Sequence, residues 1–383
     1  MSLTLVRAIN FLRSFLLNFT SFYLPLLFVN YGFSGLEIGI LFSVFTVMGI
    51  LTSFPAGVLN DKLSIKGTII IGFLASGFYF YGVATFNSFA TILLLTVIGG
   101  FGSTLIDTSL SSIVYKSLEK KGRELGDYQA SAGFGAGIGI IIGGALLALI
   151  LFKSVLIITA VSFFLLIVVA LFLPKIRFAK FPVREYTVHF KKKYMILLLI
   201  PLFLFGLHWG AESTSYSLFL KESFNLDLFE MGLYMGIPII ILGFAAYYVG
   251  RYIDRSNSIR KTFYIGLLLS GVGHALMLVP NVYASCSFRI IHEIGDAFTA
   301  VTYTVILSEI FSKKNIAGNV SIVSTIMITG SVIGSLVFGP LGEAYGYGLP
   351  FLISGILTIV AAVILYKFKI LDKIEERKSD VGN

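Results

Sequence analysis

The chain has 383 residues, of which 56% are hydrophobic and 13% are charged, and its mean hydropathy is +0.91. Soluble domains carry roughly 25% charged residues, so the composition excludes an ordinary soluble domain and favours a membrane protein. The single cysteine, Cys286, excludes an intramolecular disulfide. The net charge of +9 would suit a nucleic-acid partner, but the positions of the basic residues indicate membrane topology instead, and we expect no nucleic-acid partner.

Apolar runs recur along the whole sequence, each of about twenty residues, the length that crosses a bilayer core of about 30 Å. In the first half they lie near 8–29, 36–58, 67–86, 89–116, 128–152 and 154–173. After a polar stretch, six more lie near 195–220, 228–250, 261–280, 282–311, 317–339 and 347–368. No small-residue cleavage site precedes the first run, so we expect it to be retained. The sequence therefore predicts an all-α polytopic membrane protein with twelve transmembrane helices.

The two sets of six runs share landmarks at one constant offset. A shift of 193 positions carries Glu37 onto Glu230, Gly39 onto Gly232, Gly57 onto Gly250, Asp61 onto Asp254 and Gly102 onto Gly295. Repetition at a fixed offset indicates a duplicated unit. We therefore expect two pseudo-symmetric six-helix halves at 1–174 and 194–370, joined by a basic linker at 175–193 and followed by a tail at 371–383.

Lysine and arginine gather in alternate loops. If the N-terminus is cytoplasmic, the segments on that side hold 26 of the 29 basic residues, Arg7 and Arg13 among them. The outer loops hold only Lys153 and Lys221, and Arg289 lies inside a span. Because cytoplasmic loops carry such an excess, the sequence predicts a multi-pass protein of the plasma membrane with both termini in the cytoplasm. The basic surface would also attract anionic lipids of the bilayer.

A short polar turn after the second run is repeated after the eighth. The first copy, at 57–66, reads Gly-Val-Leu-Asn-Asp-Lys-Leu-Ser-Ile-Lys, and the second begins Gly-Arg-Tyr-Ile-Asp-Arg at 250–255. Both resemble the signature loop of the major facilitator superfamily, G-x-L-a-D-r-x-G-r-k, although Ser64 and Ile65 depart from it. The matching residues are Gly57, Leu59, Asp61, Lys62 and Lys66 in the first copy and Gly250, Asp254 and Arg255 in the second.

This resemblance implies a twelve-span transporter and a role for the two aspartates. Odd-numbered spans would begin on the cytoplasmic side, where the positive ends of their helix dipoles attract carboxylates. The resemblance places Asp61 against the start of span 11 and, by pseudo-symmetry, Asp254 against the start of span 5. Such contacts would latch the cytoplasmic side when the carrier faces outward. The alternative is that both aspartates only cap their own turns.

The fifth run is rich in glycine, with Gly135, Gly139, Gly143 and Gly144. Small residues at this spacing let two helix backbones approach closely. The pattern resembles the g-x-x-x-G-P-x-x-G-G motif of the superfamily's antiporters, except that Ile140 stands where that motif has proline. Plain helix packing therefore stays open as an alternative to a role specific to exporters.

Ionisable residues inside spans are costly and therefore indicate function. Span 4 carries Asp107, which would be protonated, paired across a cavity or hydrated, and span 9 carries His274, which we expect to be hydrogen-bonded between packed helices. In span 10 the spacings of three, four and seven place four such residues on one helical stripe. The groups of spans 7 and 10 are His208, Glu212, Arg289, His292, Glu293 and Asp296.

The resemblance implies that spans 1, 4, 7 and 10 line a central cavity. Asp107 and the ionisable groups of spans 7 and 10, with Trp209 and Tyr216, would therefore form the pathway of solute and protons. Burial raises a carboxyl pKa towards neutrality and histidine titrates there already, so the set suits a proton relay. We expect the coupling site at Glu212, Glu293 or Asp296, with His208 and His292 as relay groups. The alternative is a self-neutralising pair of Arg289 and Glu293.

The sequence and the resemblance together predict a secondary active transporter that moves a small solute by alternating access, as a proton-coupled exporter working as a monomer. A facilitator or a proton symporter for a sugar or organic solute is the alternative. A membrane-embedded sensor or enzyme is the alternative of another class, and the sequence carries no H-E-x-x-H motif or nucleotide-binding P-loop to favour it. We expect no cofactor, no metal and no enzymatic activity.

Overall fold

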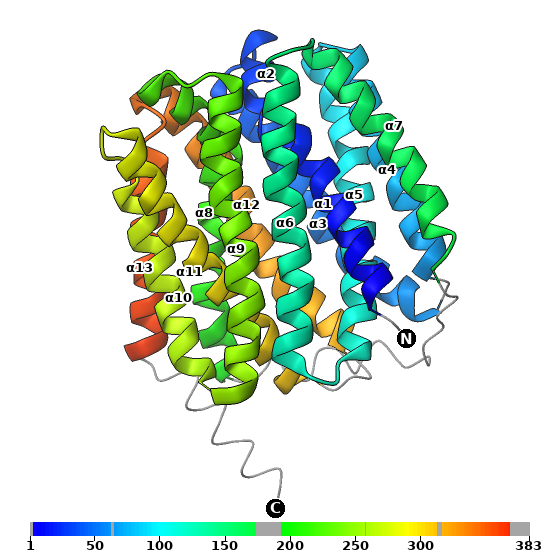
Figure 1. Cartoon of the computed structure of the whole chain (residues 1–383), viewed down its shortest axis with the longest axis vertical. Coiled ribbons are helices and arrows are strands. Elements are labelled where there is room, and N and C mark those ends of the chain that lie inside the picture. The colour runs from blue at the N-terminus through cyan, green and yellow to red at the C-terminus, as the bar shows by residue number, and fades with distance from the viewer. Residues whose placement is uncertain (1–2, 63–64, 174–192, 257, 312–315, 368–383) are drawn as a thin grey trace, which may run out of the picture.

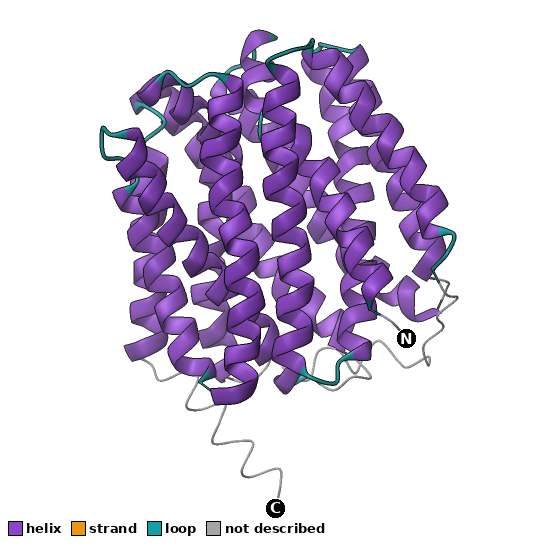
Figure 2. Ribbon diagram, viewed as in Figure 1, coloured by secondary structure: helices purple, strands orange, loops and turns teal. Residues whose placement is uncertain are grey.

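A computed structural model of the protein describes residues 3–62, 65–173, 193–256, 258–311 and 316–367. Within these ranges the chain is helical, with short turns and no strand (Figure 2). The expected linker at 175–193, apart from Lys193, and the expected tail at 371–383 lie outside the described residues.

Seven helices make up the first six spans (Figure 1). They are α1 Thr4–Ser21, α2 Leu24–Asn30, α3 Gly35–Lys62, α4 Ile65–Thr85, α5 Phe89–Ser117, α6 Lys121–Leu147 and α7 Phe152–Ala170. The first span is therefore interrupted, which corrects the continuous run that the sequence predicts. Pro25 lies in the first turn of α2, where its missing N–H removes no helical hydrogen bond.

Six helices form the second set of spans. They are α8 Lys193–Phe224, α9 Leu228–Ser256, α10 Ile259–Leu276, α11 Val282–Ile310, α12 Ile316–Tyr345 and α13 Leu349–Lys367. In the described ranges, eleven spans are long and apolar enough to cross a membrane, counting α1 and α2 as one. The twelfth, α10, has 18 residues, or about 27 Å of helix. The expected all-α architecture of twelve spans is confirmed.

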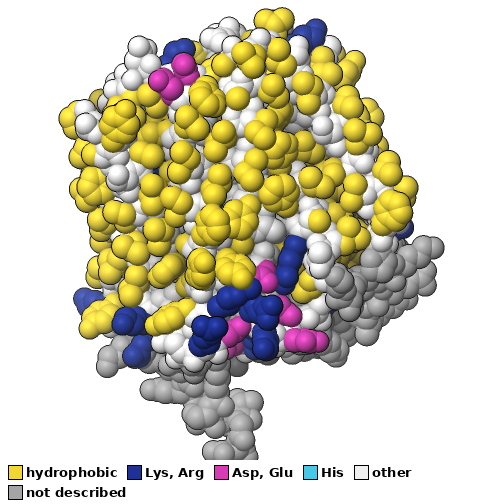
Figure 3. Space-filling model, viewed as in Figure 1, with side chains coloured by type: hydrophobic (Ala, Val, Ile, Leu, Met, Phe, Trp, Pro, Cys, Tyr) yellow, Lys and Arg dark blue, Asp and Glu magenta, His cyan; other side chains and the backbone are white. Residues whose placement is uncertain are grey.

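Charged and apolar side chains separate on the surface of the molecule. We call the end where α1 begins and α13 ends the terminal end, and the opposite one the distal end (Figure 1). On the face in view, Lys and Arg gather at the terminal end and apolar side chains cover most of the rest (Figure 3). This distribution suits a protein whose flanks contact lipid and whose terminal end contacts water and headgroups.

The repeat predicted from the sequence has a counterpart in local structure. At the start of α3, Glu37 Oε2 accepts a hydrogen bond from the Ser34 backbone N–H at 2.9 Å. At the start of α9, Glu230 Oε2 accepts one from the Asp227 backbone N–H, also at 2.9 Å. Each pair is a capping box, and the two pairs are related by the same offset as the other landmarks. The second and eighth spans are therefore built alike.

Glycines set how closely α6 approaches its neighbours. On one side, Gly133 and Gly137 lie against Gly243 and Gly236 of α9, so these two helices of different halves pack backbone to backbone. On the other side, Gly135, Gly139 and Gly143 face the backbone of α1, where an added Cβ would overlap the carbonyl oxygens of Phe11, Phe15 and Phe19. Gly144 lies against Tyr23 and Leu228. All four predicted glycines thus serve helix packing.

Candidate functional site

A cavity of about 270 Å³ lies between the two halves, towards the terminal end. It is lined by α3, α5 and α6 of the first half and by α11 and α12 of the second. The later turns of α5 and α11 and the first turns of α6 and α12 place it at that end. Eleven of its 18 lining residues carry a hydroxyl group, and in the described chain only Asp107 among the lining residues is a carboxylate or a basic group. The lining is therefore suited to hydrogen bonding with a polar solute. Prominent members are Ser53, Thr104, Ser111, Tyr115, Tyr128 and Tyr303.

Asp107 is paired with an arginine of the first span. Arg13 Nη2 lies 2.5 Å from Asp107 Oδ2 and also donates a hydrogen bond to Ser103 Oγ at 3.1 Å. The Arg13 side chain is 10% exposed, whereas that of Asp107 is 48% exposed towards the cavity. Arg13, which the sequence analysis counts with the cytoplasmic segments, lies within α1, and its side chain is buried in the protein. Of the alternatives for Asp107, the structure has the ion pair.

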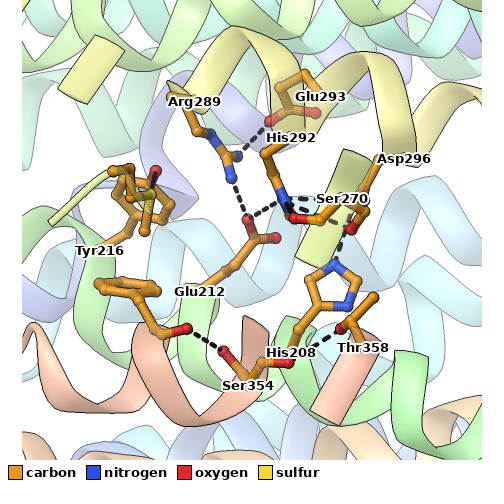
Figure 4. Close-up of polar contacts among 12 residues, drawn as sticks. His208, Glu212, Tyr216, Ser270, Arg289, His292, Glu293, Asp296, Ser354 and Thr358 are labelled. Carbon is orange, nitrogen blue, oxygen red and sulfur yellow. Dashed lines mark hydrogen bonds and ion pairs between the residues drawn. The ribbon is translucent and has the colours of Figure 1, made fainter. Parts of the chain in front are cut away.

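The ionisable residues of spans 7 and 10 form one buried cluster between α8 and α11 (Figure 4). Arg289 bridges two carboxylates, with Nη1 at 2.5 Å from Glu212 Oε1 and Nη2 paired with Glu293 Oε1 on its own helix. Its guanidinium also lies over the ring of Tyr216, 4.5 Å from the centroid. The predicted pair of Arg289 and Glu293 is therefore present, and Glu212 joins it.

Two histidines complete the cluster. His208 Nε2 lies 3.2 Å from Asp296 Oδ2, and His292 Nε2 lies 3.3 Å from Glu212 Oε1 and 3.7 Å from Asp296 Oδ2. Both rings are fully buried. The nitrogens of His208 and His292 and a carboxylate oxygen of Glu212 lie within 4.8 Å of one another, an arrangement able to hold a cation.

The neighbours of the cluster are apolar rings and a third histidine. Trp209 contacts His208, with ring centroids 5.8 Å apart. His274 of α10 lies 4.4 Å, between ring centroids, from His292. Neither ring nitrogen of His274 has a hydrogen-bond partner among the described residues, so the hydrogen bond expected for this residue is not formed there.

The cluster and the cavity are separate. Of the residues predicted for the pathway, Asp107 lines the cavity of about 270 Å³ and none of the cluster residues does. A second cavity of about 200 Å³ is formed mainly by α1, α2, α3 and α5, and it reaches α8 only at Ser213, the neighbour of Glu212. The helical stripe of α11 is thus present, but it faces α8 and α10 and not the cavity.

The second signature loop contacts the other half of the protein. Asp254 Oδ1 accepts a hydrogen bond from the Gly122 backbone N–H at 2.9 Å, and Oδ2 accepts one from the Arg123 N–H at 2.8 Å. The carboxylate therefore caps the start of α6, the fifth span. Gly250 packs on the backbone of Gly122. This contact coexists with the cavity at the same end, so it does not by itself seal that end.

The other signature residues that the structure describes make no such contact between the halves. Gly57 is buried in α3, Arg255 is exposed at the end of α9, and the Lys66 ammonium donates to the Leu171 carbonyl. The side chains of Asp61 and Lys62 lie outside the described residues, as does the contact expected between Asp61 and span 11.

Sequence reasoning misses a contact at the distal end. Glu343, near the end of α12, accepts a hydrogen bond at Oε2 from the Gly35 backbone N–H at 2.8 Å, and so caps the start of α3 in the other half. Beneath it, Ser43 Oγ donates to the Val332 carbonyl at 3.1 Å. The carboxylate–helix contacts of Glu343 and Asp254 thus join the halves at opposite ends. No motif marks Glu343, and only its position one residue after Gly342 at a span end is visible in the sequence.

Comparison with known proteins places the chain in a family. The profile described as Major Facilitator Superfamily matches residues 7–260 and 203–381. An uncharacterized MFS-type transporter of Methanocaldococcus jannaschii is 22% identical over 361 residues, covering 88% of this chain and 89% of that protein. The multidrug efflux protein YfmO of Bacillus subtilis is 21% identical over 340 residues, covering 86% and 83%.

Solved structures share the fold. The nucleoside transporter NupG superposes with a TM-score of 0.75 at 18% identity, covering 96% of this chain and 98% of that one. The human organic anion transporter MFSD10 superposes with a TM-score of 0.73 at 15% identity, covering 95% and 100%. Since the family profile matches nearly the whole sequence, the chain belongs to the Major Facilitator Superfamily of membrane transporters.

Proposed function

We propose that this protein exports a small polar solute through the cavity between its halves, in exchange for protons. The observation that carries the proposal is the position of Asp107, the one carboxylate of the lining, beside eleven hydroxyl-bearing residues. Coupling requires that solute binding and protonation affect the same group. Asp107 meets this condition because it faces the cavity on one side and Arg13 on the other.

The exchange would arise from competition at the Asp107 carboxylate. When ionised, this group only accepts hydrogen bonds and can bind the hydroxyl groups of a solute in the cavity, whereas a proton on Asp107 takes up part of that acceptor capacity and so displaces the solute. Solute and proton therefore do not act independently at this site. The cluster between α8 and α11, which the sequence favours for coupling, lines neither cavity, so we assign coupling to Asp107.

Alternating access would proceed by rocking of residues 1–174 against 194–370. With both termini in the cytoplasm, as the basic residues of the terminal end favour, the cavity faces the cytoplasm and the distal contact of Glu343 closes the outside. The seam between α6 and α9 would act as the axis, since glycines keep these helices in contact near both ends. We propose a monomer in the plasma membrane as the working unit.

A facilitator or proton symporter for a sugar is the second candidate, favoured by the hydroxyl groups of the lining, which match a polyhydroxylated solute. Export is supported by the likeness to a multidrug efflux protein over most of the chain. The transporter family gives no support to the reading as a membrane-embedded enzyme or sensor.

Counterflow in proteoliposomes tests the proposal. The protein is reconstituted with an internal proton-sensitive dye, and candidate sugars, nucleosides and organic cations are added with and without a pH gradient. We expect a solute whose movement shifts internal pH, and Asp107→Asn should abolish that shift while leaving solute exchange. Asp296→Asn is the matched carboxylate control in the cluster. If Asp296→Asn abolishes the shift and Asp107→Asn does not, coupling lies in the cluster and our assignment is wrong.

A further inference from the structure

We propose that His208, Glu212, His292 and Asp296 form a binding site for a divalent transition-metal ion of the Zn²⁺ class. The four residues lie on α8 and α11, line neither cavity, and have no part in the transport mechanism above. The proposal is independent of proton coupling at Asp107.

The two imidazoles are oriented as metal ligands are. His292 Nδ1 lies 2.8 Å from the Ser270 carbonyl oxygen, and His208 Nδ1 is hydrogen-bonded to the Phe205 carbonyl oxygen. A carbonyl oxygen only accepts, so Nδ1 carries the proton in both rings. Histidines that bind metals almost always hold their second nitrogen in this way, by donating it to a carbonyl or a carboxylate.

The Nε2 atoms of both rings face carboxylate oxygens. With Nδ1 protonated, a neutral ring presents a lone pair at Nε2. His208 Nε2 points at Asp296 and His292 Nε2 at Glu212, so acceptors oppose acceptors at 3.2 and 3.3 Å. His292 Nε2 and Asp296 Oδ1 are buried and have no hydrogen-bond partner in the described part of the chain. A cation between these atoms removes the repulsion.

The separations between the ligand atoms are close to those around a bound ion. Ligands at about 2.0–2.2 Å from a tetrahedral Zn²⁺ lie about 3.3 Å from one another. The observed separations of 3.2, 3.3 and 3.7 Å among neighbouring ligand atoms match this value. The atoms of His208, Glu212 and His292 spread to no more than 4.8 Å, so the site needs a contraction of up to about 1.5 Å to close on an ion.

The cluster carries more carboxylates than its arginine neutralises. Glu212, Glu293 and Asp296 supply three negative charges when ionised, and Arg289 is the one Lys or Arg paired with any of them in the described chain. Two negative charges remain, which one divalent ion neutralises. Imidazole nitrogen with carboxylate oxygen is a ligand set that suits Zn²⁺, Co²⁺ and Ni²⁺, and disfavours Mg²⁺ and Ca²⁺. Glu212, whose side chain is 21% exposed, is the point of entry.

Titration of tag-free purified protein with Co²⁺ tests the site, because four-coordinate Co²⁺ absorbs visible light far more strongly than the hydrated ion. We expect one equivalent to bind with this absorption and Zn²⁺ to displace it. His292→Asn keeps a donor for the Ser270 carbonyl but removes Nε2, and His208→Asn does the same for its ring. Each should weaken binding by at least about 100-fold, the upper range for loss of even an indirect partner.

Two controls separate this outcome from general disruption. His274→Asn changes a buried histidine that touches His292 but offers no ligand to the set, and should bind Co²⁺ as the parent does. Folding of each variant is checked by size exclusion and thermal unfolding. Absence of the absorption in folded parent protein overturns the proposal and leaves protons as the compensating cations. Equal binding by His292→Asn and His208→Asn also overturns it, since the ion then lies elsewhere.

Discussion

The contact of Glu343 with the start of α3 should control how often the distal end opens. Glu343→Gln keeps an amide oxygen for the Gly35 N–H but removes the charge that the helix N-terminus attracts. A carboxylate at an exposed helix N-terminus contributes about 0.3–1 kcal/mol, and a charged acceptor strengthens a hydrogen bond further. We expect Glu343→Gln to destabilise the closed distal end by about 1 kcal/mol, which corresponds to about a fivefold higher ratio of open to closed distal ends.

The assay uses one reporter cysteine beneath this contact. Ser43 is 4% exposed and lies between α3 and α12, so Ser43→Cys in a Cys286→Ser background should react with a maleimide only when the two helices separate. We expect the labelling rate of purified protein to rise about fivefold in Glu343→Gln. The increase should shrink in about 1 M salt, where the Debye length is about 3 Å.

Glu37→Gln is the matched control for this experiment. Glu37 is a carboxylate at the same end of α3, but it caps its own helix through Ser34 and makes no contact between halves in the described structure. Its substitution should leave the labelling rate near that of the parent. Unchanged labelling in Glu343→Gln, or an equal rise in both variants, would refute the reasoning.

Three further predictions concern the interior and the terminal end. Gly139→Leu would force a side chain into the backbone of α1 at Phe15, so we expect a lower thermal unfolding temperature, with Gly67→Leu, whose position is open, as the tolerated control. Arg289→Met leaves buried carboxylates without their cation and should destabilise by about 3–5 kcal/mol, measured by denaturant unfolding; a value near zero would mean that the cluster is hydrated. Asp254→Asn should raise labelling of Ile253→Cys, a buried neighbour of the cap, by a few fold, and an unchanged rate would show that the cap of α6 is dispensable.

The architecture follows from local sequence for a physical reason. A bilayer demands about twenty apolar residues per span, so the pattern of hydropathy predicts the helices without knowledge of their packing. The offset that joins Glu37 to Glu230 likewise predicts a repeat whose capping boxes the structure contains. Hydropathy alone does not predict the contact of Asp254 with the fifth span. That prediction also requires the family's signature loop and the pseudo-symmetry of the two halves.

The missed features depend on long-range packing. Arg13 lies near the start of a span, where an arginine usually reaches water, and only its contact with Asp107, 94 positions away, explains its burial. The helical stripe of α11 is readable from spacing, but the rotation of that helix about its axis is not. Rotation decides whether His292 and Asp296 face the cavity or α8, and the structure has them facing α8 and α10. The role of Glu343 likewise depends on the packing of α12 beside α3, which the sequence does not show.

Thermal unfolding of the purified protein against a solute library, at about pH 5.5 and 7.5, shows whether solute binding is linked to protonation of Asp107. A solute present at 100 times its dissociation constant should stabilise the fold by about 2.7 kcal/mol. We expect a polar, hydroxyl-bearing ligand that stabilises the parent to different extents at the two pH values and stabilises Asp107→Asn equally at both. A ligand that stabilises the parent equally at both pH values would contradict exchange with protons at Asp107.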